Sequence, residues 1–311
     1  MDGYSNVEKI IKNMEKVIVG KRDVINMAVI SILCEGHMLL EDVPGTGKTT
    51  FAKTLAKTMG CGFNRIQFTP DTLPSDVTGV SVYNMQKGIF EYMKGGIMSN
   101  VVLVDEINRA SPKTQASLLE AMEEQQVTVD GNTYSLPRPF MVIATQNPID
   151  YIGTYNLPEA ELDRFFMKLS MGYPSKEEGK DMVNRFLSNR KWREVNASIG
   201  QDEILEMQQE ITKIEVNEDI IDYILNITEK TRNNEHIELG ISPRATLDWI
   251  KGSQAMAYCN KREYVIPDDV IKVFKPIIEH RIILSSEAKM NQMSCEKVLE
   301  NIKYSVKVPI F

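Results

Sequence analysis

The sequence is poor in cysteine and histidine and has no long apolar run. Its four cysteines lie far apart and form no CxxC pair, which argues against a zinc site or a disulfide framework. No apolar run approaches the roughly 20 residues that a membrane-spanning helix needs, and the mixed-charge start does not resemble a signal peptide. We therefore expect a cytoplasmic protein of 311 residues with no membrane span.

Positive charge is also scarce. The chain has 36 lysines and arginines against 43 aspartates and glutamates, which gives a formal charge of −7. Surfaces that bind nucleic acid usually carry a basic excess or stripe, so we expect no nucleic-acid partner. What is present suits a globular chain, because 42% of the residues are hydrophobic and 25% are charged.

Apolar runs alternate with amphipathic helical stretches along the first half of the chain. This alternation predicts a parallel sheet covered by helices on both faces. From about residue 175 onward helical periodicity dominates, so we expect an αβα domain over residues 1–174 and a helical domain over residues 175–311. Two insertions with strand character, residues 77–96 and 127–136, interrupt the first domain. The expected strands of the sheet are residues 37–41, 63–68, 100–106, 139–147 and 164–171.

The stretch VPGTGKTT, residues 43–50, predicts a phosphate-binding loop. An apolar run precedes it and an amphipathic helix follows, which is the context that the GxxxxGK[ST] pattern requires. Asp42 replaces the first glycine of the pattern, and we expect it to adopt left-handed backbone, which Asp tolerates. Lys48 would reach the β and γ phosphates, and Thr49 would bind Mg²⁺. The predicted ATP-binding residues are Asp42, Val43, Pro44, Gly45, Thr46, Gly47, Lys48, Thr49 and Thr50.

The stretch VVLVDE, residues 101–106, predicts the other half of an ATPase site. An apolar strand would place Asp105 beside the phosphate loop, where its carboxylate can hold Mg²⁺. Glu106 could then polarise the attacking water. Taken alone, the pair Asp105 and Glu106 could be a charged strand end that meets solvent. The spacing between this pair and the phosphate loop along the sequence favours the catalytic interpretation.

Six longer segments resemble the MoxR ATPases of the AAA+ superfamily, and the resemblance runs along nearly the whole chain. It implies an AAA+ αβα sandwich with a parallel sheet and a C-terminal helical lid. It also implies a Mg²⁺-ATP-dependent, chaperone-like remodeller that forms a ring homo-oligomer, usually a hexamer, and acts on proteins with a von Willebrand factor A domain. The segments are LLEDVPGTGKTTFAKTLA, RIQFTPDTLPSDVTG, VVLVDEINRASPKTQASLLEAMEE, FMVIATQNPID, LPEAELDRFFMKL and GISPRATL.

The same resemblance assigns roles to four polar residues outside the phosphate loop. Asn147 matches a sensor that holds the water or the γ-phosphate. Arg164 matches the arginine finger that reaches a neighbouring subunit's nucleotide. Arg244 matches a second sensor, carried by the lid, which the resemblance also makes an ATP-binding residue. Gln67 matches a position where a polar residue can tether Glu106 when the partner is absent.

The residues alone leave other interpretations open. Asn147 could simply form a turn, Arg164 could pair on the surface with Asp163 or Glu161, and Arg244 could be an exposed residue in the first turn of a helix. The two insertions resemble loops that face a ring's pore or a partner, but they could also merely cover the sheet.

Three functions fit the sequence. The first is the remodelling ATPase, in which Val80, Val82 and Tyr83 of the first insertion would grip polypeptide. The second is the ATPase subunit of a metal chelatase, which shares the motif order. The third is a nucleotide-gated scaffold with little turnover, and Glu106 argues against it because such a switch has little need of a water-activating carboxylate.

Overall fold

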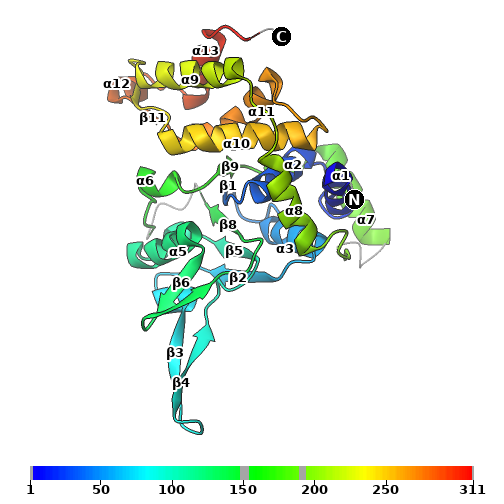
Figure 1. The fold of residues 1–311 in the computed structure, drawn as a ribbon, viewed down its shortest axis with the longest axis vertical. Helices are drawn as coiled ribbons and strands as arrows, with labels where there is room; N and C mark the ends of the chain where they lie inside the picture. The colour runs from blue at the N-terminus through cyan, green and yellow to red at the C-terminus, as the bar shows by residue number, and fades with distance from the viewer. Residues whose placement is uncertain (1–2, 148–153, 189–193, 310–311) are drawn as a thin grey trace.

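A five-stranded parallel sheet forms the centre of the N-terminal half in the computed structural model, which describes residues 3–147, 154–188 and 194–309 (Figure 1). Its strand order is β2-β5-β8-β1-β9, and every neighbouring pair is parallel. The predicted parallel sheet is therefore confirmed. Its strands are β1 (Met38–Glu41), β2 (Phe63–Gln67), β5 (Val101–Asp105), β8 (Met141–Gln146) and β9 (Met167–Leu169).

The last strand is much shorter than the sequence suggested. We expected a strand over residues 164–171, but β9 contains only three residues. The amides of Arg164 and Phe165 instead donate to the carbonyls of Glu161 and Leu162, which closes the turn after α6 (Glu159–Leu162). The apolar run over residues 164–171 thus includes the turn that leads into β9 as well as the strand itself. The length of such a run does not show where the turn ends and the strand begins.

Side-chain alternation along the strands divides the buried residues into two cores, one on each face of the sheet. In β5, Val101 and Leu103 belong to one core, and Val102 and Val104 belong to the other. Because all five residues of β5 are buried, this strand is covered on both faces, as expected for a parallel sheet.

Helices of the two halves of the chain share one of these cores. Buried residues of α1, α2 and α3 pack in the same cluster as those of α8, α9, α10 and α11. No helix among the described residues is long and apolar enough to cross a bilayer. The helices are α1 (Gly3–Glu15), α2 (Arg22–Leu33), α3 (Lys48–Thr58), α4 (Pro74–Thr78), α5 (Pro112–Glu124), α6, α7 (Lys176–Ser188), α8 (Gln201–Ile211), α9 (Glu218–Arg232), α10 (Pro243–Cys259), α11 (Pro267–Ile278), α12 (Ser286–Met290) and α13 (Cys295–Tyr304), with short 3-10 turns η1 (Ile107–Arg109) and η2 (Glu279–Arg281).

Both predicted insertions form antiparallel hairpins. The first pairs β3 (Gly79–Asn84) with β4 (Ile89–Lys94) and projects from the body of the molecule (Figure 1). The second pairs β6 (Gln126–Val129) with β7 (Asn132–Ser135). A third small sheet, in the lid, pairs β10 (Ile237–Leu239) with β11 (Ile283–Leu284).

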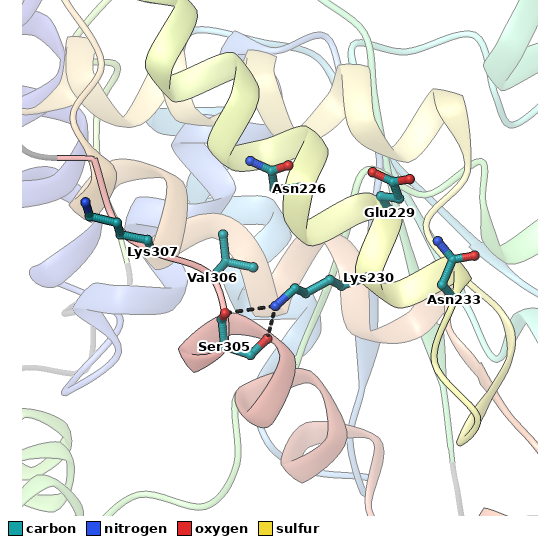
Figure 2. Close-up of a pocket in the computed structure, with 7 residues that line it drawn as sticks. All are labelled: Asn226, Glu229, Lys230, Asn233, Ser305, Val306 and Lys307. Carbon is teal, nitrogen blue, oxygen red and sulfur yellow. Dashed lines mark hydrogen bonds between the residues drawn. The ribbon is translucent and has the colours of Figure 1, made fainter.

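The segment that follows α13 returns to α9 and leaves a shallow hollow between them (Figure 2). The Nζ of Lys230 donates to the carbonyl and the hydroxyl oxygens of Ser305, at 2.8 and 2.9 Å. These bonds tie the segment after α13 to α9, and the hollow lies between the two.

Candidate ATPase site

The carboxyl ends of three adjacent strands, β5, β8 and β1, meet at one edge of the sheet and form a pocket there. In parallel α/β sheets this edge is where ligands bind. The pocket brings together most of the predicted site residues, which come from four sequence segments. Its lining residues are Asp42, Pro44, Gly45, Gly47, Lys48, Thr49, Thr50, Arg65, Gln67, Asp105, Glu106, Thr145, Gln146 and Asn147.

The phosphate loop has the backbone that its glycines permit. Gly45 and Gly47 have φ of +87° and +93°, where a side chain would be strained even though the space beside both Cα atoms is open. Gly47 caps α3, and no side chain fills that cap. The first amides of the helix therefore remain available to an anion, and the helix dipole favours negative charge there.

Lys48 is the first residue of α3, and its Nζ is held over the loop. It donates to the backbone carbonyls of Asp42, at 2.8 Å, and Val43, at 3.1 Å. Partial burial lowers the pKa of Lys48, while the nearby carboxylates of Asp42, Asp105 and Glu106 oppose that shift. The ammonium is thus aimed into a pocket rich in oxygen atoms.

Our explanation for Asp42 was wrong. Asp42 is not among the described non-glycine residues with positive φ, so it does not replace glycine by adopting left-handed backbone. It is buried, and its carboxylate accepts hydrogen bonds from the Ser170 hydroxyl at 2.8 Å and from the amides of Met171 and Gly172 at 2.6 and 2.9 Å. The carboxylate therefore holds the segment after β9 against the phosphate loop.

Asp105 ends β5 with both carboxylate oxygens engaged. Oδ2 lies 2.6 Å from Nε of Arg65, and Oδ1 accepts from the Thr145 hydroxyl at 3.2 Å. Strand pairing explains this arrangement, because β2 and β8 are the two neighbours of β5 in the sheet. A cationic group thus already lies against the carboxylate that we expect to face a metal ion.

Glu106 follows Asp105 in left-handed backbone, with φ 58° and ψ 53°. Such a conformation is uncommon for glutamate and is found preferentially at functional sites. Its amide donates to the Thr145 hydroxyl at 2.9 Å. Its carboxylate accepts from Nε2 of Gln67 at 2.9 Å and lies 3.1 Å from Nε of Arg109. The tether predicted between Gln67 and Glu106 is present in this structure.

The donor set of the pocket fits Mg²⁺ better than a transition metal. Thr49 and Asp105 line the same pocket and offer hard oxygen ligands. Within the described ranges, no cluster of three or more His, Cys, Asp or Glu residues could bind a metal by itself. A magnesium ion held by a hydroxyl, a carboxylate, water and substrate phosphates needs no such cluster.

Two other predicted residues, Arg164 and Arg244, lie together in a different hollow. Both pair with Glu123, at the end of α5: Nε of Arg164 lies 3.4 Å from Oε2, and Nη1 of Arg244 lies 3.0 Å from Oε1. Asp163, the alternative partner considered for Arg164, contacts Ser242 and Arg281 instead. Residues 34–37, which lead into β1, also line this hollow.

The strands show why one chain cannot bring the two hollows together. Residues 34–37 precede β1 and the phosphate loop follows it; likewise Arg164 precedes β9, and Met171 to Tyr173 follow it. The arginines therefore lie at the amino edge of the sheet and the phosphate loop at its carboxyl edge. A four-residue strand such as β1 separates these edges by about 13 Å. In Figure 1, α5, α6 and the start of α10 accordingly lie on the left, and α3 and α7 on the right.

Sequence reasoning missed Arg65, Thr145 and Glu123. Arg65 precedes Gln67 by two residues on β2, so period-two alternation would have placed both on one face. Thr145 lies beside Asp105 only because β8 neighbours β5, and Glu123 meets the two arginines only in the folded chain. Asn147 lines the carboxyl-edge pocket, and the remainder of the predicted turn, residues 148–150, lies outside the described residues.

Comparisons with known proteins agree with this geometry. A family model described as "ATPase family associated with various cellular activities (AAA)" matches residues 37–167, and a model of the AAA lid domain matches residues 229–302. The crystal structure of a putative ATPase from Cytophaga hutchinsonii superposes with a TM-score of 0.92 at 40% identity, covering 99% of this chain and 96% of that one. The fold and its site therefore define an AAA+ ATPase with a C-terminal helical lid.

Two curated relatives narrow the class. The Bacillus subtilis protein YeaC, described as uncharacterized, is 47% identical over 97% of this chain and 94% of its own length. The chaperone MoxR1 of Mycobacterium tuberculosis is 36% identical over 97% of this chain and 82% of its own length. The chain belongs to the MoxR family of AAA+ ATPases, and it is an ATP hydrolase with a chaperone-like role. A scaffold without turnover does not fit this assignment.

Proposed function

We propose that this chain is a Mg²⁺-ATP-dependent remodelling ATPase that works as a ring of identical subunits, with six as the number expected from the family. One observation carries the proposal: the phosphate loop and the pair Arg164 and Arg244 lie at opposite edges of one sheet. A head-to-tail arrangement of chains would bring the amino edge of one subunit to the carboxyl edge of the next, and such contacts can close into a ring.

ATP would bind with its phosphates on the loop amides and Lys48. Next to the phosphate pocket lies a more apolar hollow that shares Gly45, Gly47 and Thr50 with it, and Val17, Tyr173 and Met182 line that hollow. We place the adenine and ribose there. α7 thus supplies the lid's part of the subunit's own nucleotide pocket, whereas Arg244 would serve the neighbour.

Hydrolysis needs a base, an anion cradle and positive charge near the γ-phosphate. Glu106 is the base in this proposal, and Asn147 orients the attacking water. Arg164 and Arg244 of the adjoining subunit would stabilise the charge that develops on the γ-phosphate. Mg²⁺, held by Thr49 and Asp105, would neutralise charge on the β and γ phosphates; for Asp105 to accept it, Arg65 must leave Oδ2.

The exposed β3–β4 hairpin would contact the client. Val80, Val82 and Tyr83 are about half exposed, and Phe90 is 72% exposed, an unusual amount of apolar surface for one hairpin. We propose that these side chains grip polypeptide. On the family resemblance, the clients would carry a von Willebrand factor A domain and the ring would work in the cytoplasm.

Mixing two inactive variants tests the shared site. Arg164→Ala chains keep an intact phosphate loop, and Lys48→Ala chains keep an intact arginine pair. If the site lies between subunits, co-assembled rings should recover phosphate release that neither variant shows alone. A mixture that assembles, as judged by light scattering with differently tagged chains, and shows no recovery would refute the shared site.

A further inference from the structure

The turn that carries Arg164 is held on both sides by the lid. Its preceding residue, Asp163, accepts from the hydroxyl of Ser242 at 3.2 Å and pairs with Nε of Arg281 at 3.5 Å. Its following residue, Phe165, offers its backbone carbonyl to Nη2 of Arg281, at 2.8 Å. Two lid segments that are far apart in sequence, at Ser242 and at Arg281, therefore fix one turn of the N-terminal half.

Arg281 is the centre of this arrangement. Its side chain is only 1% exposed, and besides the turn it binds Asp248 of α10, with Nη2 2.7 Å from Oδ2. A planar guanidinium carries five N–H donors in a fixed fork, so it can bond a carboxylate on each side and a carbonyl together. Its Nη1 has no hydrogen-bond partner among the described residues.

His280, the residue before Arg281, strengthens the same contact. Burial lowers the pKa of His280 to about 3, so its ring is neutral. Its Nε2 lies 2.9 Å from the carbonyl of Phe165, and because a carbonyl only accepts, Nε2 carries its hydrogen. Two adjacent side chains of η2 thus hold one backbone oxygen next to Arg164.

The contact between Ser242 and Asp163 also fixes the position of Arg244. Ser242, which contacts Asp163, is the N-cap of α10 and accepts from the amide of Ala245 at 3.0 Å. Arg244 lies between these two residues in the first turn of the helix. The contacts that fix the turn of Arg164 are therefore joined to the helix end that carries Arg244.

We propose that Arg281 is a positioning residue that locks Arg164 and Arg244 into one unit, so that both enter the neighbouring subunit's site together. This inference rests on the proposed shared site. It predicts that Arg281 acts on turnover in the neighbour and leaves nucleotide binding in its own subunit unchanged. Any rotation of α10 and α11 would then move both arginines at once.

The first test compares Arg281→Met with a matched variant. Arg262→Met breaks another lid pair with a buried carboxylate, because Nη1 of Arg262 lies 2.6 Å from Oδ2 of Asp269. Both variants lose a similar contact, but only Arg281 touches the turn of Arg164. We expect Arg281→Met to lower kcat at least tenfold with the Kd for a fluorescent ATP analogue within twofold of wild type. Assembled Arg262→Met should keep kcat within twofold.

The second test asks whether Arg281 acts through Arg164. The double variant Arg164→Ala, Arg281→Met should lose much less kcat than the product of the two single losses, because the function lost through Arg164 is shared and only the positioning of Arg244 remains to be lost. Arg281→Met chains should also recover phosphate release when co-assembled with Lys48→Ala chains. Multiplying effects in the double variant, or no recovery in assembled mixtures, would overturn the positioning role.

A milder variant covers the case in which Arg281→Met fails to fold. Asp163→Asn keeps the shape of the side chain and removes the charge that faces Arg281, and its kcat should also fall at least tenfold in assembled rings. If Arg164→Ala is inactive but assembled rings of Asp163→Asn or Arg281→Met keep the wild-type kcat, the inference about Arg281 is overturned. If Arg164→Ala itself kept wild-type turnover, the shared site would fail first.

Discussion

The two edges of the central sheet treat their charged groups differently. At the carboxyl edge, Lys48 points into a pocket with Asp105 and Glu106, and among the described residues its Nζ donates to the backbone carbonyls of Asp42 and Val43. At the amino edge, Arg164 and Arg244 share the carboxylate of Glu123. The carboxyl edge is open to a bound anion. At the amino edge the two arginines already pair with an anionic group of their own chain, the carboxylate of Glu123. The carboxyl edge offers a binding site for phosphates, and the amino edge offers cations that are restrained until they are needed. These two properties fit the two faces of a single contact between neighbouring subunits.

The largest expected effect separates binding from turnover. Lys48→Ala should abolish detectable ATP binding and lower phosphate release by about 10³-fold, because the ammonium faces the phosphates in both ground and transition states. Arg164→Ala should lower phosphate release by a comparable factor and leave ATP binding within threefold. Fluorescent-analogue binding and phosphate release measure the two quantities.

Two surface variants serve as controls for this comparison. Lys53→Ala removes an exposed lysine from the same helix as Lys48, and Arg138→Ala removes an exposed arginine paired with Glu35. Neither should change either quantity by more than twofold. Loss of ATP binding in Arg164→Ala would contradict the division of roles between the edges.

Much of the carboxyl edge could be predicted from sequence, because its residues follow strands in short contiguous motifs. Lys48, Asp105 and Glu106 each end or follow an apolar run, and parallel strands place such ends together. The amino edge could not be assembled this way. Arg164, Arg244 and Glu123 come from three separate segments, and only the tertiary packing of α10 against the rest brings them together. The role of Arg281 could not be predicted, because nothing in the sequence distinguishes an arginine that will be buried from any other charged residue in a helical stretch.

At Asp42, comparison with the phosphate-loop pattern led to a wrong expectation about the backbone. Because its carboxylate accepts two amides and a hydroxyl, restoring the consensus glycine should destabilise the protein. We expect Asp42→Gly to lose about 3 kcal/mol of stability, from hydrogen bonds to a charged acceptor and from the amides left buried. Thermal unfolding of Asp42→Gly and Asp42→Asn would measure it, and the asparagine, which can still accept one of the bonds, should lie between. An unchanged or raised melting temperature for Asp42→Gly would contradict the assigned role of the carboxylate.

A smaller effect is expected from freeing the arginines. Glu123 is exposed, and each of its ion pairs contributes at most about 1 kcal/mol. Because both arginines must leave Glu123 to reach a phosphate, Glu123→Gln should raise kcat two- to fivefold in assembled rings. The adjacent exposed Glu124→Gln is the control and should have no effect. A fall in kcat of more than fivefold would instead mean that Glu123 orients the arginines during hydrolysis.

The smallest effect concerns the corresponding restraint at the carboxyl edge. Gln67→Ala removes one exposed hydrogen bond to Glu106, worth about 0.5 kcal/mol, while Arg109 still pairs with that carboxylate. Basal turnover should therefore rise about twofold with ATP binding unchanged, and a tenfold fall would show that Gln67 positions the base rather than restrains it. The double variant Gln67→Ala, Glu123→Gln then sharpens the comparison of the two edges. If one restraint holds the base and the other holds the neighbour's arginines, the two rate increases should multiply, because the groups released are different and lie in different subunits.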